Sequence, residues 1–364
     1  MRSSGDGGRS EEQFVSRVQR YALTPAYSIS RAIKGGWQLA GGHGRVDRDR
    51  ALEDMRLYLE AGVTTFDCAD IYTGVEELIG EFVRRHRRAM RDGSLPAVQI
   101  HTKCVPDLDS LPTLQKRDVE SIVDRSLQRL GVDRLDLVQL HWWDYSIPGY
   151  VEALAHLQSL QKVGKIRELG VTNFDVPHLV EILEAGIDVV SNQVQYSVLD
   201  HRPERGMVSL CRRQGIALLC YGTVAGGLLS NRHLHAPEPR YPHENRSVTK
   251  YKLIVDDFGG WDLFQQLLTT LSEIAHKHEV SIATVASRYI LEKKGVGAVI
   301  IGARDALHLP ETLRLFDIAL ESEDLAAISR VVEQATGPAG DVYSLERIKG
   351  EKHAAIMKYN LNRE

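Results

Sequence analysis

Residues 65–80, TFDCADIYTGVEELIG, combine the end of an apolar strand, a polar turn and the first turn of a helix. The turn carries two acidic residues, Asp67 and Asp70, and the phenol of Tyr72. In chains that alternate strands with helices, such turns hold catalytic side chains. Asp67 and Tyr72 are therefore the first catalytic candidates. Taken alone, they fit a structural role equally well, with Asp67 capping the turn and Tyr72 packing as a half-buried aromatic.

The composition is that of an ordinary globular protein. The chain has 364 residues, of which 43% are hydrophobic and 26% are charged, and its net charge is -4. This is enough apolar material for a large core, and α/β barrels reach this length as one domain. We find no basic block that would follow a phosphate backbone, so we expect no nucleic-acid partner.

The chain shows no sign of export or membrane insertion. The first twenty residues mix basic and acidic side chains without an apolar segment, so we expect residues 1–26 to be a flexible leader. The longest apolar runs, at 135–140 and 296–301, are far too short to span a bilayer. The cysteines lack CxxC spacing, and we expect them to be reduced core thiols of a cytoplasmic protein. They are Cys68, Cys104, Cys211 and Cys220.

Short apolar segments alternate with amphipathic segments along the chain, as in proteins built of strands and helices. Eight strands of parallel-sheet character indicate a single α/β domain, a (β/α)8 TIM barrel over residues 27–336 with long substrate loops. We expect residues 337–364 to form a C-terminal tail near the pocket, and residues 222–260 to be the longest irregular segment. The predicted strands are 28–34, 63–66, 97–102, 134–140, 166–171, 188–191, 216–220 and 298–301.

An open dinucleotide-binding sheet is the alternative to a closed barrel. It would require the spacing GxGxxG after the first strand, and residues 41–44 lack it. The glycines that follow the first strand still allow the backbone to approach a ligand closely. The barrel is therefore the favoured architecture.

Three consecutive predicted strands end in polar residues. Asp67 ends the second strand, with Tyr72 five residues further on, while Lys103 ends the third and His141 the fourth. Adjacent strand ends face one mouth of a barrel, so we expect these four side chains to converge. A buried lysine needs a partner, and Asp67 is the nearest candidate.

This group of residues suits proton transfer. Tyrosine titrates near pH 10 in water, and a nearby cation such as Lys103 favours its ionised form. Tyr72 would then be a general acid, and His141 would donate a hydrogen bond to the same substrate oxygen. Each residue alone also fits a structural role, as a buried ion pair or a core imidazole.

The motifs resemble those of the aldo-keto reductase superfamily over about residues 28–332. The family pattern of Asp, Tyr, Gly and Glu before a helix is matched by Asp67, Tyr72, Gly74, Glu76 and Glu77. Lys103 and His141 match the remaining two members of the family's catalytic tetrad. Residues 164–174 and 192–196 are similar to the motifs of the fifth and sixth strands.

The resemblance implies a reductase that transfers hydride from NADPH or NADH to a carbonyl substrate, without a metal and with Tyr72 as proton donor. Thr172, Asn173 and Gln193 match residues that bind the nicotinamide carboxamide, and Tyr221 matches the aromatic under the ring. The cofactor-binding residues expected on this basis are Gly36, Trp37, Thr172, Asn173, Gln193, Tyr221, Gly222, Thr223, Gly302, Arg304, His308, Glu311 and Thr312.

The eighth strand departs from the family pattern. Gly302, His308 and Thr312 stand where many members have Lys, Arg and Asn. Arg304 remains as a cation for a 2′-phosphate, and Asp305 beside it weakens the local field. We therefore expect NADPH to be preferred, with NADH as the alternative.

The substrate class is suggested by aromatic residues near the strand ends. Trp37, Trp142 and Trp143 would line the mouth and favour an apolar or aromatic aldehyde, ketone or alcohol, although packing of loop against barrel explains them equally well.

Two other functions stay open. One is a lyase in which Lys103 forms a Schiff base, and the other is a non-catalytic, NADP-binding regulatory barrel.

Overall fold

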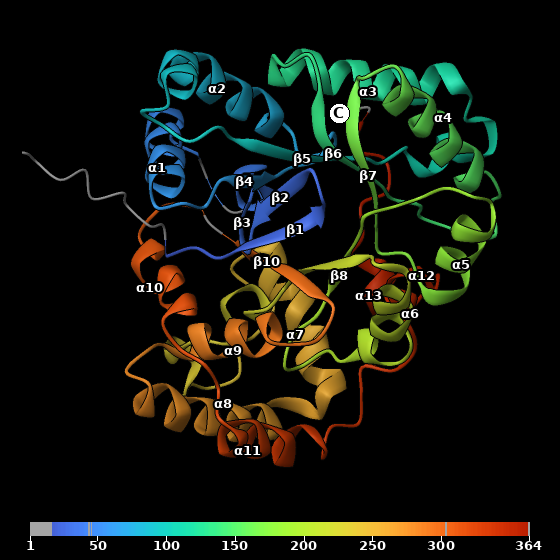
Figure 1. Cartoon of the computed structure of the whole chain (residues 1–364). Helices are drawn as coiled ribbons and strands as arrows, with labels where there is room; N and C mark the ends of the chain where they lie inside the picture. The colour runs from blue at the N-terminus through green and yellow to red at the C-terminus, as the bar shows by residue number, and fades with distance from the viewer. Residues whose placement is uncertain (1–16, 43, 45, 303, 363–364) are drawn as a thin grey trace, which may run out of the picture.

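The computed structural model describes residues 17–42, 44, 46–302 and 304–362. Eight parallel strands close into a barrel in the order β10-β3-β4-β5-β6-β7-β8-β9 (Figure 1). The predicted (β/α)8 barrel is therefore confirmed. Its strands are β3 (Ala32–Gly35), β4 (Thr65–Asp67), β5 (Gln99–Cys104), β6 (Leu135–Leu140), β7 (Ile166–Thr172), β8 (Ser191–Gln195), β9 (Ala217–Tyr221) and β10 (Val296–Gly302).

Helices surround the barrel and bury their apolar faces against its strands (Figure 1). Among the described residues, no helix is both long enough and apolar enough to cross a membrane. The helices are α1 (Arg48–Glu60), α2 (Val75–Asp92), α3 (Lys116–Leu130), α4 (Tyr150–Lys162), α5 (Val176–Glu184), α6 (Met207–Gln214), α7 (Arg246–Phe258), α8 (Gly260–Lys277), α9 (Ile282–Leu291), α10 (Leu309–Leu313), α11 (Ser322–Val332), α12 (Ser344–Arg347) and α13 (Lys352–Ala355).

A hairpin closes the N-terminal end of the barrel. Strands β1 (Arg20–Thr24) and β2 (Tyr27–Ser30) pair antiparallel directly before β3. Apolar side chains of the hairpin pack into the barrel interior, and a 3.0 Å hydrogen bond joins the hydroxyl of Tyr27 to Nε2 of the buried His101. The opposite end, where the strands finish, is thus left for the site.

The predicted leader is too long. It extends to residue 26, whereas β1 begins at Arg20 and its Leu23 is buried in the inner core. Residues 1–16 lie outside the described residues. Leu23 is the one fully buried side chain of β1, so this strand carries little of the apolar alternation that identifies strands in a sequence.

Three further elements differ from prediction. Helix α7 lies inside residues 222–260, which are predicted to be irregular, and begins where the side chain of Asn245 accepts a hydrogen bond from the Val248 amide (3.0 Å). Strand β8 begins at Ser191 rather than residue 188, because its buried side chains are mostly polar and an apolar run does not mark it. Helix α5 is not among the predicted elements.

Helix α2 contradicts the expectation that the chain has no basic block. Its C-terminal half carries five arginines within eight residues, and they line a hollow on the surface. The expectation that nucleic acid is no partner therefore rests on the overall charge and stays a prediction. The arginines are Arg84, Arg85, Arg87, Arg88 and Arg91.

The C-terminal tail is held against the barrel by a buried ion cluster. Arg202, in the segment after β8, binds Asp200 (2.7 Å) and Glu346 of helix α12 (3.0 Å). All three side chains are almost fully buried. One buried guanidinium therefore joins the tail to the barrel. Removing one partner from such a buried pair is costly, because the other charge is left buried without compensation.

A second arginine fixes the tail over the strand ends. Arg347 donates hydrogen bonds to the carbonyl of Trp142 (2.8 Å) and to that of Asn173 (3.1 Å), which follow β6 and β7. Further on, the Asn362 side chain donates to the carbonyl of Val105 after β5 (2.8 Å). The tail thus crosses the mouth of the barrel.

Arg202→Met should lower the free energy of unfolding by about 3–5 kcal/mol, because it leaves two buried carboxylates without their cation. Arg232→Met is the matched control: it breaks an exposed pair with Glu244 and should cost less than about 1 kcal/mol. Urea unfolding followed by intrinsic fluorescence measures both. Equal, small losses would show that the cluster does not hold the tail.

Candidate active site

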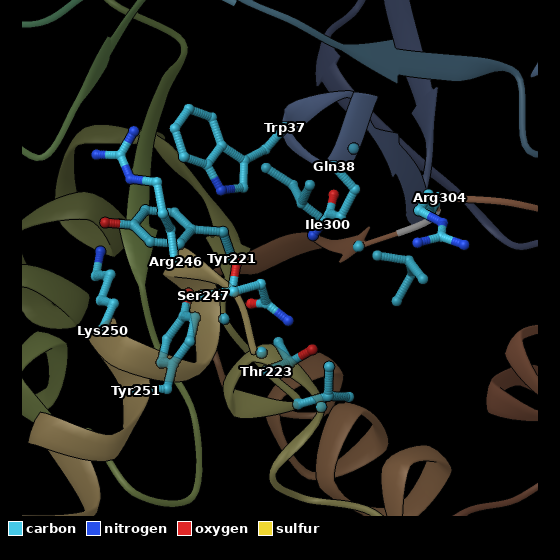
Figure 2. Close-up of a pocket in the computed structure, with 18 of the residues that line it drawn as sticks. Trp37, Gln38, Tyr221, Thr223, Arg246, Ser247, Lys250, Tyr251, Ile300 and Arg304 are labelled. Atoms are coloured by element: carbon cyan, nitrogen blue, oxygen red, sulfur yellow. The ribbon is translucent and has the colours of Figure 1, made fainter. Parts of the chain in front are cut away.

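The C-terminal ends of the barrel strands surround a cavity of about 1090 Å³, part of which is seen in Figure 2. It contains all four predicted catalytic residues and most of the predicted binding residues. The predicted residues that line it are Trp37, Asp67, Tyr72, Lys103, His141, Trp143, Thr172, Asn173, Gln193, Tyr221, Gly222, Thr223, Gly302, Arg304, His308, Glu311 and Thr312.

A buried ion pair lies in the wall of this cavity. Lys103 on β5 donates to Oδ2 of Asp67 on β4 (2.7 Å) and to the carbonyl of Cys68 (2.8 Å). Burial alone would lower the pKa of Lys103, but the charge and hydrogen bond of Asp67, together with Tyr72, outweigh it and raise that pKa above its ordinary value. Lys103 is therefore a permanent cation at neutral pH.

Tyr72 lies against this cation. The ring of Tyr72 is centred 5.0 Å from the Lys103 ammonium. Burial raises the pKa of Tyr72, and the charge of Lys103 opposes the rise without cancelling it. The phenol thus holds its proton in the resting protein, and Lys103 reduces the cost of releasing it.

His141 is a neutral acceptor, which corrects its predicted role as a donor. Its Nδ1 lies 3.2 Å from the carbonyl oxygen of Thr172, and since a carbonyl can only accept, the ring proton is on Nδ1. Burial, helped by the charge of Arg347, lowers the pKa of His141 to about 3. Its buried Nε2 has no hydrogen-bond partner among the described residues and carries a lone pair.

Two side-chain amides form a group beside the ion pair. Gln193 on β8 donates through Nε2 to Oδ1 of Asp67 (2.7 Å), and Asn173 accepts through Oδ1 from the Tyr221 hydroxyl (2.8 Å). The described residues give no partner to Oε1 of Gln193 or to Nδ2 of Asn173. The cavity therefore offers one amide acceptor and one amide donor. The Thr172 hydroxyl is already engaged, because it donates to the backbone carbonyl of Gln193 (3.1 Å).

The far end of the cavity lies after β10. Arg304, Asp305 and Glu311 line it, so cationic and acidic side chains are mixed there. A side chain in place of Gly302 would have to displace the amide of Gln38, whose nitrogen lies 2.5 Å from the position of a Cβ atom. Gln38 thus fills the space that a side chain at position 302 would need.

Gly36 does not line the cavity, contrary to prediction. Its amide donates to the carbonyl of Asp67 (2.8 Å). A Cβ atom on Gly36 would lie 2.8 Å from that carbonyl oxygen and 2.8 Å from the Val75 side chain. The glycine is required because β3 and β4 approach closely behind Asp67, and its role is structural.

Trp142 is also wrongly predicted as a substrate contact. Its indole is fully buried away from the cavity and donates to the carbonyl of Ile147 (2.8 Å). The next residue, Trp143, does line the cavity and packs edge-on against His141, with ring centres 4.3 Å apart. Trp143 therefore faces the cavity together with His141, while Trp142 between them faces the surrounding core.

Several lining residues are missed by the sequence prediction. They come from the turn after β3, from α1, from helix α7 and from the tail. The sequence contains one signal for them, a pair of basic residues four positions apart in α7. The prediction that residues 222–260 are irregular hides this helical spacing. They include Gln38, Tyr58, Arg246, Ser247, Lys250, Tyr251 and Tyr343.

No metal site accompanies this arrangement in the part of the chain that the structure describes, where no group of three or more His, Cys, Asp or Glu side chains could hold an ion.

Comparison with known proteins gives a consistent result. The Aldo/keto reductase family model matches residues 32–333. An NADH-specific methylglyoxal reductase of Escherichia coli (strain K12) is 25% identical over 333 residues, covering 85% of this chain and 97% of that protein. An aryl-alcohol dehydrogenase of Pestalotiopsis microspora is 25% identical over 328 residues, covering 85% and 78%. The solved structure of a thermostable aldo-keto reductase with the inhibitor epalrestat superimposes with a TM-score of 0.66 at 25% identity, covering 86% of this chain and 99% of that one.

His141 should stay neutral, with its proton on Nδ1, from about pH 5 to pH 9, because its pKa lies near 3. Two-bond ¹⁵N–¹H correlation spectra of protein labelled with ¹⁵N-histidine report both properties, and the signals lost in His141→Gln identify the residue. A protonated Nε2, or titration near the ordinary histidine pKa, would contradict the assignment.

Proposed function

Because the chain belongs to the aldo/keto reductase family, we propose that it moves hydride between NADPH or NADH and a small carbonyl or alcohol substrate, with Tyr72 as the proton donor. Family membership makes it an oxidoreductase that acts on carbonyl compounds with a nicotinamide cofactor. The observation that carries the proposal is the buried Asp67–Lys103 pair with the Tyr72 ring 5.0 Å from its ammonium.

The cavity fits a nicotinamide dinucleotide. Its volume of about 1090 Å³ lies at the upper end of ordinary ligand sites and exceeds what a small carbonyl compound needs. The Oε1 of Gln193 and the Nδ2 of Asn173 complement the amino group and the oxygen of a carboxamide. Tyr221 offers an aromatic ring beside them. When bound in its reduced form, the cofactor supplies the hydride.

Proton transfer is assigned to Tyr72. The phenol gives its proton to the substrate oxygen as negative charge develops there, and Lys103 stabilises the phenolate that remains. Asp67 keeps Lys103 charged and in place, and is itself held by Gln193. The lone pair on Nε2 of His141 can accept a hydrogen bond from the Tyr72 hydroxyl or from an alcohol.

The same pKa argument weighs against a Schiff-base lyase. A lysine that forms a Schiff base has to lose its proton, which is favoured by a lowered pKa. Asp67 raises the pKa of Lys103 instead. Lys103 is therefore better suited to hold charge than to attack a carbonyl.

For the cofactor, NADPH is the preferred form in this proposal and NADH the alternative. Arg304 is the fixed cation at the far end of the cavity, where a 2′-phosphate would bind, while Asp305 and Glu311 reduce the potential there. For the substrate, Trp37 and Trp143, with Met357 and Leu361 of the tail, line an apolar mouth that suits an apolar or aromatic carbonyl compound.

A cytoplasmic location belongs to the same proposal. The four cysteines are buried and form no disulfide. Burial raises the pKa of each thiol, which keeps it protonated and unreactive. Such thiols suit a reducing compartment.

Tyr72→Phe should lower kcat for the reduction of 4-nitrobenzaldehyde by about 10²–10⁴-fold, the contribution of a positioned acid, and leave cofactor affinity unchanged. Lys103→Met should also lower kcat, because the phenolate loses its cation. The control is Tyr241→Phe, which removes an exposed hydroxyl. Near-normal turnover by Tyr72→Phe, with loss in His141→Ala, would assign the proton to another donor.

Both cofactors should quench the intrinsic tryptophan fluorescence on binding, with NADPH binding more tightly. Arg304→Ala should weaken NADPH by about tenfold, as expected for loss of a charge-assisted contact, and NADH by less. Arg330→Ala, an exposed arginine of α11, is the control. Absence of quenching by either cofactor would refute the proposed function, and an equal effect of Arg304→Ala on both would show that Arg304 does not bind the 2′-phosphate.

A further inference from the structure

Lys250 is one of several charged residues of the cavity to which the tetrad gives no role. Lys250 extends from helix α7 into the cavity wall, on the same side as Tyr221 and Tyr251 (Figure 2). Its ammonium lies against three tyrosine rings. The ring centres of Tyr221, Tyr251 and Tyr343 lie 5.0, 5.7 and 5.6 Å from Nζ. Among the described residues, no side chain or carbonyl accepts a hydrogen bond from this ammonium. Aromatic faces attract a cation, but they do not satisfy three N–H donors.

The nearby acidic groups are already occupied. Asp200 and Glu346 direct their oxygens to Arg202, and the Gln195 amide also donates to Asp200 (2.7 Å). Burial lowers the pKa of Lys250, and the charges of Glu346 and Asp200 oppose that effect from a distance. These carboxylates offset the effect of burial only in part, because Arg202 acts with burial to lower the pKa of Lys250. The hydrogen-bonding capacity of the ammonium stays available to an anion in the cavity.

Lys250 lies at the substrate end of the cavity. Tyr343, one of its three aromatic neighbours, packs edge-on against His141 with ring centres 5.5 Å apart. Tyr343 therefore contacts both the Lys250 ammonium and the His141 ring. In Figure 2, Lys250 and Arg304 lie on opposite sides of Tyr221, which separates this ammonium from the expected 2′-phosphate position.

We propose that Lys250 binds the carboxylate of an anionic substrate whose carbonyl group lies at Tyr72 and whose apolar or aromatic middle packs against the tyrosines. This rests on the proposed function and narrows it to oxo-acids and aldehyde-acids, or the matching hydroxy-acids. A carboxylate fits better than a phosphate, because one ammonium supplies a single charge and lacks the fork of donors that an arginine offers.

The test compares two aldehydes of nearly equal shape, 4-carboxybenzaldehyde and its neutral methyl ester, methyl 4-formylbenzoate. Wild-type protein should have the lower KM for the acid. Lys250→Met should raise the KM for the acid by about 10–100-fold, the equivalent of one hydrogen bond to a charged group, and move kcat far less. The ester should respond by at most about threefold, and Lys250→Arg should restore part of the preference.

Lys349→Met is the matched control, because this exposed lysine of the tail pairs with Asp144 and does not line the cavity. It should leave both KM values unchanged. An equal rise for acid and ester in Lys250→Met would show that Lys250 only supports the fold, and would overturn the inference.

Direct binding separates this inference from the proposed function. Quenching of tryptophan fluorescence by 4-carboxybenzaldehyde should be strong in wild type and weak in Lys250→Met, whether or not the aldehyde is reduced. If wild type reduces neither aldehyde but retains this difference, the proposed reaction fails and the carboxylate subsite stands. Equal binding of the acid by wild type and Lys250→Met refutes the subsite.

Discussion

The ion pair of Asp67 and Lys103 is the interaction on which the site depends. Two charges removed from water are stable only when each has further hydrogen bonds, and here the partners come from different strands. Lys103 on β5 also binds the Cys68 carbonyl, while Gln193 on β8 supplies the second contact to Asp67 from across the barrel mouth. The complete set of contacts to the pair therefore requires the closed barrel, because Gln193 lies on the opposite side from Asp67.

The residues predicted best from the sequence are charged residues in apolar segments. Burying such a charge costs free energy unless a partner of opposite charge compensates it. A lysine at the end of an apolar strand requires an anion, and that requirement alone points from Lys103 to Asp67. Several barrel strands are marked by short apolar runs, whereas β5 and β8 bury mostly polar side chains. Prediction fails where the role of a residue depends on the direction in which its side chain points. Trp142 and Trp143 are adjacent and chemically alike, and nothing in the sequence says which one faces the cavity.

The substrate end of the cavity is built from segments without a motif. Helix α7 supplies Lys250 and the tail supplies Tyr343. The tail is held in place by contacts such as the Arg202–Glu346 pair, which joins the segment after β8 to α12. Such contacts join residues more than a hundred positions apart, and no local pattern reports them. For this reason the chemistry of the tetrad can be inferred from the sequence, whereas the shape and charge of the substrate pocket require the fold.

The hairpin that closes the N-terminal end of the barrel has a thermodynamic consequence. It encloses His101, whose pKa burial lowers to about 3, as burial also does for His141 at the opposite end. Both imidazoles are neutral in the folded chain and regain their ordinary pKa near 6.5 when it unfolds. Unfolding below that pH therefore takes up protons, so the contribution of these two residues to stability is complete above about pH 6.5 and is lost as the pH falls toward 3. Desolvation of the two imidazoles thus makes their contribution to stability sensitive to acid.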